Sequence, residues 1–335
     1  MTLFRSWPGV GPTLAAAAWL VAAAAALQPM DAQAQAQDAY PSRTITLVVP
    51  FPAGSGSDMS ARLLAKDMSE SMGQTVVVDN RPGANGALGS QAVARARPDG
   101  YTLLVGVAAT HAANYAFYPG KLGYQPSSFE LVGGLGVVPL SMFVAAGAPW
   151  KSLADLIADA KKNPGKIACG SGTTVSQVAC EVFKRRAGIE LLNIPYKGSP
   201  PALTDLAGGQ VQLVFADGTS ASTLLENKRL RVLATAAGKR LPYWPDVPTF
   251  VELGMTDLEM SAWSALFAPV GTPIAVLRKL NAAAIRSAET PEAVAARNRS
   301  GSLALVLTLE EGRRFVATEI ERWARLVKDS GVKLE

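Results

Sequence analysis

The sequence predicts an α/β protein in which parallel strands carry helices on the faces of a sheet. Short β-branched runs alternate with longer helical patterns, starting with ITLVV at Ile45–Val49 and the apolar periodicity of Met59–Met72. A second strand at Thr75–Asp79, a helix at about Leu88–Arg95 and a third strand after the turn at Pro98–Gly100 continue the order. This alternation favours parallel strands joined by helical crossovers.

The middle of the chain predicts a second sheet of the same kind. Ser152, followed three residues later by Asp155, resembles a capping box that opens a helix over 153–162. SAWSALFAP at Ser261–Pro269 is predicted as a strand that returns the chain to the first half, and the remainder is helical. The further elements that we expect are strands Lys166–Cys169, Leu191–Pro195 and Val211–Ala216, and helices Gln177–Ala187, Ile274–Ala288, Pro291–Arg299 and Leu309–Ser330.

The N-terminus has the order of a secretory signal peptide. Arg5 precedes an apolar run at Leu14–Leu27, and small-residue A-x-A sites follow at Ala32–Ala34 and Ala34–Ala36. The run is shorter than the ~20 residues that a membrane-spanning helix needs, although a retained N-terminal anchor is the alternative. We expect residues 1–36 to be removed by cleavage near Ala36, which leaves an exported, periplasmic protein.

The composition excludes several classes of function. The net charge is +5 and no run of Lys and Arg is longer than three residues, which argues against a nucleic-acid surface. His111 is the single histidine, so a multi-histidine zinc site is excluded, and we expect no metal and no cofactor. A catalytic pair of Cys169 as nucleophile and His111 as base is disfavoured, because Cys180 is an equally good partner for Cys169. The two cysteines either form a disulfide or remain buried thiols.

The loop Pro50–Asp58, PFPAGSGSD, is the first candidate site. It lies between a strand and a helix, where backbone N–H groups and the helix dipole favour an anion. A third glycine and a following lysine are missing, so a nucleotide phosphate is disfavoured against a carboxylate. Gly54 and Gly56 permit close approach of a ligand, and Ser55 and Ser57 supply donors.

Asp58 is unexpected in an anion-binding loop, because its negative charge repels an anionic ligand. We expect it to be the N-cap of the following helix. The functional alternative is that it holds ordered water or accepts a hydrogen bond from an amine or hydroxyl group of the ligand.

A second donor-rich loop follows the strand at Lys166–Cys169, and other polar residues follow further strands. Ser176 is expected to be the N-cap of the next helix. Lys197 either pairs with a ligand carboxylate or is solvated. The carboxyl ends of parallel strands form the ligand crevice of open α/β sheets. The candidates at these ends are Ser171, Thr173, Thr174, Ser176, Lys197, Asp217 and, in the first half, Thr110.

Four segments resemble the Bug family, the periplasmic substrate-binding proteins of tripartite tricarboxylate transporters. They are YPSRTITLVVPFPAGSGSDMSARLLA, VVVDNRPGANGALGSQAVARARPDGYTLLVG, IPYKGSPPALTDLAGGQV and PDVPTFVELG, and the resemblance extends over essentially the whole mature chain. It implies a type II periplasmic-binding-protein fold in which two lobes are joined by two crossover strands. The expected lobes are residues 37–140 plus 262–335, and residues 141–261.

The resemblance also implies a role for each loop. The loop matching Phe51–Asp58, which includes Ala53, would grip one carboxylate of a small solute, partly through water, and the loop matching Ser171–Ser176 would close from the other lobe. The sequence departs from the family pattern in two places. Ala53 stands where the family often has glycine, and Phe215-Ala216-Asp217 (FAD) stands where the family often has FDN. The acidic side chain of Asp217 disfavours a second carboxylate at the far end of the ligand and favours an amine or amide there.

The expected function is therefore that of a solute-binding protein, not an enzyme, which captures an organic or amino-acid carboxylate between its lobes. Closure is expected to be a hinge motion about crossover strands near Leu135–Val144 and Ser261–Pro269. The expected partners are the carboxylated solute and membrane transporter subunits, and the protein is expected to be a monomer. The rival hypotheses are a periplasmic ligand sensor or scaffold that docks onto a membrane signalling partner, and a secreted enzyme.

Overall fold

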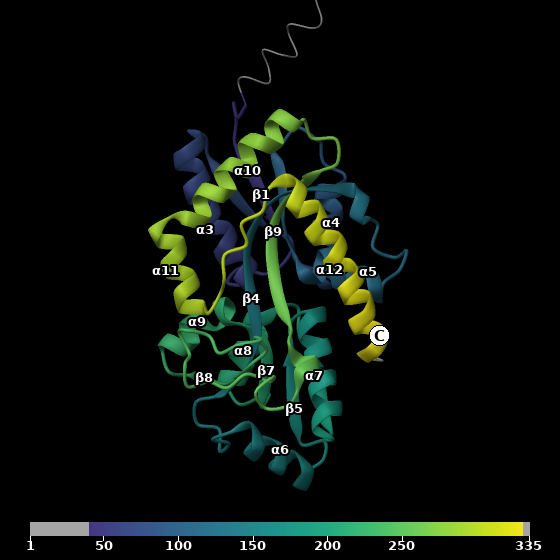
Figure 1. Cartoon of the computed structure of the whole chain (residues 1–335), viewed down its shortest axis with the longest axis vertical. Helices are drawn as coiled ribbons and strands as arrows, with labels where there is room; N and C mark the ends of the chain where they lie inside the picture. The colour runs from purple at the N-terminus through teal and green to yellow at the C-terminus, as the bar shows by residue number, and fades with distance from the viewer. Residues whose placement is uncertain (1–39, 331–335) are drawn as a thin grey trace, which may run out of the picture. The chain divides into compact units, whose positions relative to one another are not determined.

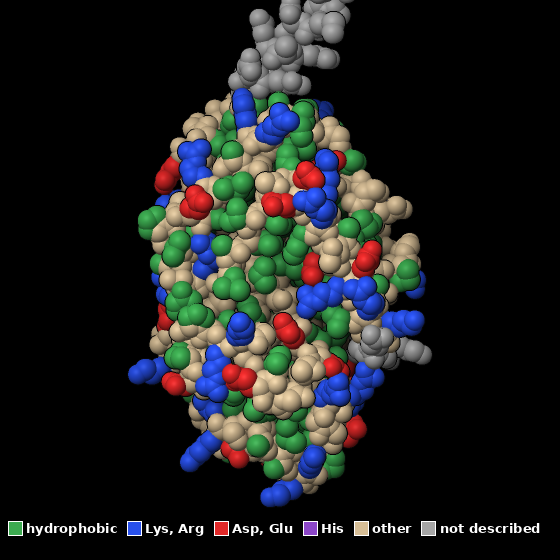
Figure 2. All heavy atoms as spheres, in the orientation of Figure 1, with side chains coloured by type: hydrophobic (Ala, Val, Ile, Leu, Met, Phe, Trp, Pro, Cys, Tyr) green, Lys and Arg blue, Asp and Glu red, His purple; other side chains and the backbone are tan. Residues whose placement is uncertain are grey.

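The structure, a computed structural model, describes residues 40–330, and the predicted signal peptide lies outside them. The described residues from Arg43 onward form one compact unit. No helix in the described part of the chain has the length and apolarity needed to cross a membrane. Basic and acidic side chains are interspersed over the face drawn in Figure 2, where no single-sign patch dominates.

The described strands form one nine-stranded sheet, ordered β2-β1-β3-β9-β4-β7-β5-β6, with β8 paired to β4. Strands β1, β2 and β3 pair in parallel, as do β5, β6 and β7, which confirms the predicted α/β alternation. The long strands β4 and β9 run antiparallel to each other. The strands are β1 Ile45–Val49, β2 Val76–Asn80, β3 Thr102–Val107, β4 Phe129–Ala145, β5 Ile167–Ser171, β6 Leu191–Pro195, β7 Leu213–Asp217, β8 Leu230–Thr235 and β9 Ser261–Pro269.

Helices flank both groups of parallel strands. In Figure 1, α3 and α10 lie on one side of β1, β4 and β9, while α4, α5 and α12 lie on the other. The helices are α3 Gly56–Met72, α4 Ala87–Ala94, α5 Asn114–Phe117, α6 Leu153–Lys162, α7 Thr174–Ala187, α8 Ser199–Ala207, α9 Gly218–Glu226, α10 Ile274–Glu289, α11 Pro291–Ser300 and α12 Leu309–Ser330. The Ser152–Asp155 capping box is present at the start of α6, as predicted.

The strand β4 joins the two groups because it changes partners along its length. From Phe129 to Pro139 it pairs with β9, and from Leu140 onward it pairs with β7 and β8. The two predicted sheets are therefore continuous through one strand. Strand β9 has the bounds predicted for the returning strand. The lobe boundaries at residues 140 and 262 stay a prediction.

Candidate ligand-binding site

The loop after β1 folds around a tight turn and a serine cap. Strand β1 is buried between its two parallel neighbours. Gly54 has a φ of +79°, a conformation that favours glycine. Ser55 is the N-cap of α3, and its hydroxyl accepts a hydrogen bond from the Asp58 N–H at 3.3 Å. The prediction that Asp58 caps this helix is wrong, because the helix begins at Gly56, three residues earlier than such a cap requires.

Asp58 instead braces the loop from inside. Its carboxylate accepts hydrogen bonds from the Gly54 N–H at 2.9 Å, from Arg62 Nε at 3.0 Å and from Asn80 Nδ2 at 2.9 Å. Burial of the Asp58 carboxyl acts to raise its pKa, but these hydrogen bonds and the charge of Arg62 outweigh burial and lower the pKa. Asp58 thus fixes the turn that carries Gly54 and the first residues of α3.

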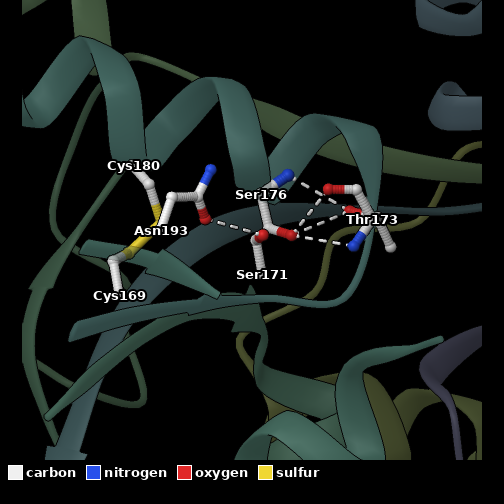
Figure 3. Close-up of a disulfide and its surroundings, with 6 residues drawn as sticks. All are labelled: Cys169, Ser171, Thr173, Ser176, Cys180 and Asn193. Atoms are coloured by element: carbon white, nitrogen blue, oxygen red, sulfur yellow. Dashed lines mark hydrogen bonds between the residues drawn. A yellow bond between two sulfur atoms is a disulfide. The ribbon is translucent and has the colours of Figure 1, made fainter. Parts of the chain in front are cut away.

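The second loop, after β5, uses a reciprocal cap (Figure 3). Thr173 Oγ1 accepts from the Ser176 N–H at 3.1 Å, and Ser176 Oγ accepts from the Thr173 N–H at 2.9 Å. The predicted N-cap, Ser176, is therefore wrong by three residues. This capping box starts α7 at Thr174, ahead of the predicted start at Gln177.

A disulfide joins Cys169 of β5 to Cys180 of α7 (Figure 3). It decides the question that the sequence left open between a bridge and two thiols. Because its sulfur is bonded, Cys169 offers no thiolate, and this removes the nucleophile from the enzyme hypothesis. The bridge also ties the strand that ends in this loop to the helix that starts from it.

His111 is buried and stacks on Phe267, with 3.9 Å between the ring centroids. Burial lowers its pKa to about 3, so the ring is neutral near pH 7. Its Nδ1 lies 2.9 Å from Thr110 Oγ1, which also hydrogen-bonds the backbone of Val107. Thr110 and His111 therefore stabilise the turn after β3. No group of three His, Cys, Asp or Glu side chains within residues 40–330 is placed to hold a metal ion.

A pocket opens where four helices begin. The N-terminal ends of α3, α7, α8 and α9, which follow β1, β5, β6 and β7, all contribute lining residues. Helix N-termini carry partial positive charge and unpaired N–H groups. The Ser57 N–H, in the first turn of α3, has no acceptor within its own helix. The polar lining residues are Ser55, Ser57, Ser60, Thr173, Ser199, Asp217, Thr219, Ser220 and Ser264.

The rest of the pocket wall is apolar. The Trp263 Nε1–H donates to Glu319 Oε2 of α12 at 2.8 Å, so this indole offers the pocket no free donor. The other apolar lining residues are Phe51, Val107, Ala108, Ala109, Val138, Leu140, Val175, Ala216 and Ala262. A small ligand with one anionic end and a short apolar body matches this combination.

Two hydrogen bonds join the two groups of parallel strands, and only the first of them lies between residues that line this pocket. The Gly56 N–H of α3 donates to Ser220 Oγ of α9 at 2.8 Å. Thr174 Oγ1 of α7 donates to Asn114 Oδ1 of α5 at 2.8 Å. Each of the two predicted loops is thus bonded to a helix of the opposite group of strands.

The structure brings six of the predicted site residues together and leaves eight outside the pocket. Lys197 is exposed and does not line the pocket, and Ser171 donates to Asn193 Oδ1 instead. The residues lining the pocket are Phe51, Ser55, Gly56, Ser57, Thr173 and Asp217. Those outside it are Ala53, Gly54, Asp58, Thr110, Ser171, Thr174, Ser176 and Lys197.

Sequence reasoning missed the pocket residues Ser199, Thr219 and Ser220. A signal was present for Ser220, because it stands three residues after Asp217, at the spacing of an N-cap and its partner. Asn114 has a recognisable position after the strand YTLLVG, but its partner could not be predicted. Its contact with Thr174 joins residues 60 positions apart, which only the folded chain brings together.

The comparisons with known proteins agree on one family. The protein-family model described as "Tripartite tricarboxylate transporter family receptor" matches residues 60–332 of this chain. Protein BugT of Bordetella pertussis is 37% identical over 304 residues, which cover 89% of this chain and 92% of that protein.

Two solved structures are also similar over most of the chain. Periplasmic binding protein BugD is 33% identical with a TM-score of 0.83, and the match covers 88% of this chain and 100% of that one. Rpa4515 of R. palustris, solved with adipate, is 34% identical with a TM-score of 0.84, covering 88% and 99%. The predicted periplasmic-binding-protein fold and the resemblance are confirmed. The chain belongs to the tripartite tricarboxylate transporter receptors of the Bug type, which are periplasmic solute-binding proteins and not enzymes.

Proposed function

We propose that this receptor binds a small carboxylate in the pocket at the N-termini of α3, α7, α8 and α9. The convergence of four helix N-termini on one pocket carries the proposal. Partial positive charge and unpaired N–H groups bind an anion without a basic side chain. The adipate found with Rpa4515 supports the same class of ligand.

The six predicted residues that line the pocket divide between the two expected lobes. Phe51, Ser55, Gly56 and Ser57 come from the loop after β1, while Thr173 and Asp217 follow β5 and end β7. Ligand contacts to both sides would favour closure, with hinges in β4 and β9, where β4 changes partners. We propose lobes of residues 37–140 plus 262–335, and 141–261.

The family also supports the expected partners. The receptor delivers its solute to the membrane subunits of a tripartite transporter, and it does so as a monomer. Cleavage near Ala36 would release it into the periplasm, because residues 1–36 have the order of a signal peptide.

A thermal-shift and calorimetric screen tests the proposed function. Purified mature protein is titrated with adipate and with a panel of mono-, di- and amino-carboxylates, each paired with the amide that lacks the carboxylate charge. A ligand that binds only the folded state raises Tm in proportion to the logarithm of its concentration. We expect at least one carboxylate to do so and its amide counterpart to have no effect. If no carboxylate raises Tm or gives a binding isotherm, the proposal is wrong.

A further inference from the structure

Asp217 is the one ionisable residue among the described residues that line the pocket. No lysine, arginine or histidine side chain lines it with Asp217. No ion pair joins Asp217 to a basic side chain within residues 40–330. The charge of this carboxylate therefore has no basic side chain beside it, only the N-terminus of α9, which Asp217 caps.

Hydrogen bonds orient the Asp217 carboxylate and fix its role as an acceptor. Oδ1 accepts from the Ser220 N–H at 2.7 Å, and Oδ2 accepts from the Ser220 hydroxyl at 2.8 Å. That hydroxyl is itself an acceptor for the Gly56 N–H, so its proton is directed at Asp217. Burial raises the pKa of Asp217, and the donors of Ser220 act against this change. Backbone groups of Asp217 and Thr219 also hydrogen-bond to this carboxylate, which is held as an acceptor in the wall of the pocket.

Asp217 also lies directly against the start of α3. A Cβ placed on Gly56 would overlap the Asp217 carboxylate, so the two residues are in contact. The positive end of α3 and the negative charge of Asp217 are consequently neighbours in the pocket. A ligand that fills both positions must carry an anionic group and a donor group a short distance apart.

This inference rests on the proposed function and specifies its ligand. We propose that Asp217 selects a carboxylate with an amine or amide nitrogen close to its carboxylate carbon, as in a zwitterionic amino acid. The carboxylate binds at the helix N-termini, and the nitrogen donates to Asp217. A second carboxylate in that position would face Asp217 at close range beside apolar walls, where like charges repel strongly.

Four probes with one six-carbon chain test the proposal: hexanoate, 2-aminohexanoate, adipate and butylmalonate. They differ only in what accompanies the first carboxylate: nothing, an ammonium group, a distant carboxylate or an adjacent one. Kd is measured by calorimetry at pH 7.5 for the native protein and for Asp217→Asn. Asparagine also caps helices, so this variant keeps the start of α9. Asp155→Asn, at an exposed position in the first turn of α6, is the matched control.

We expect the native protein and Asp155→Asn to bind 2-aminohexanoate at least about tenfold more tightly than the other three probes. Asp217→Asn should lose most of that preference and gain affinity for butylmalonate. If native protein binds adipate or butylmalonate as tightly as 2-aminohexanoate, the role of Asp217 is overturned while the proposed function stands. If none of the four probes binds, the role of Asp217 is contradicted, and the thermal-shift panel decides separately whether the proposed function stands.

Discussion

The N–H of Gly56 donates to the hydroxyl of Ser220 across 164 residues of sequence, at 2.8 Å. Gly56 is the first residue of α3, and Ser220 lies in the first turn of α9. Each helix follows a strand of a different parallel group, so this bond holds the two sides of the pocket together. The contact requires glycine, because the space where a Cβ would lie is filled by the Asp217 carboxylate.

Gly56→Ala should weaken ligand binding without unfolding the protein. Alanine suits a helix, so the start of α3 tolerates it, but its methyl group separates α3 from Asp217 and Ser220. We expect Kd for a bound carboxylate to rise by at least about tenfold, since lost closure reduces the binding-competent fraction. Gly147→Ala is the matched control, because no atom lies within 4 Å of the added Cβ there. Equal affinity in the two variants would contradict the role of this contact.

Ser57→Pro should remove the N–H that α3 leaves free for a ligand. Proline is tolerated in the first turn of a helix, so most of the fold should persist. A hydrogen bond to a charged group contributes about 1.5–3 kcal/mol, which predicts a rise in Kd of roughly ten- to a hundredfold. Ser57→Ala keeps the N–H and loses only the hydroxyl, so it should bind more tightly than Ser57→Pro in calorimetry. Unchanged affinity in Ser57→Pro would show that this N–H does not contact the ligand.

The Cys169–Cys180 disulfide should stabilise the second half of the sheet. A thiol titration of unfolded, unreduced protein is expected to find no free thiol. Cys180→Ser should lower the free energy of unfolding by about 2–3 kcal/mol, since the bridge closes a short loop. Reduction of the native protein should have the same effect, whereas the reductant should leave the unfolding midpoint of Cys180→Ser unchanged. Two reactive thiols in the titration would contradict the bridge.

The sequence predicted the alternation of elements well because that alternation depends on local patterns. The run SAWSALFAP gave the bounds of β9 correctly, and Ser152 marked the start of α6. Asp58 and Ser176 were misassigned for a related reason. In each loop two or three capping residues stand within three positions of one another, and only the backbone conformation decides which is the cap.

The site was predicted in part, because strand ends can be located from the sequence but contacts between distant segments cannot. Gly56 and Asp217 were identified separately, each by its position beside a strand end. Their mutual contact, and the hydroxyl of Ser220 between them, depend on how α3 meets α9. Lys197 shows the converse: it follows a strand as expected, but its side chain is exposed and outside the pocket.

Asp58→Asn should destabilise the protein at neutral pH and much less in acid. The pKa of Asp58 is lowered in the folded protein from an ordinary value of 3.8, so its ionised form stabilises the fold. This contribution is fully present above pH 3.8 and is lost as the pH falls through the lower, folded value. The three hydrogen bonds to the carboxylate suggest a loss of about 2 kcal/mol at pH 7 for the variant.

Urea unfolding at a series of pH values from neutral to strongly acidic measures this difference directly. The gap between native protein and Asp58→Asn should narrow below pH 3.8, because native Asp58 is then increasingly protonated. Asp246→Asn, at an exposed loop position, is the control and should follow the native protein throughout. If the difference in the free energy of unfolding does not change with pH, Asp58→Asn destabilises the protein through the shape of the asparagine side chain and not through the lost charge. In that case the ionised carboxylate would not be what holds the turn at Gly54.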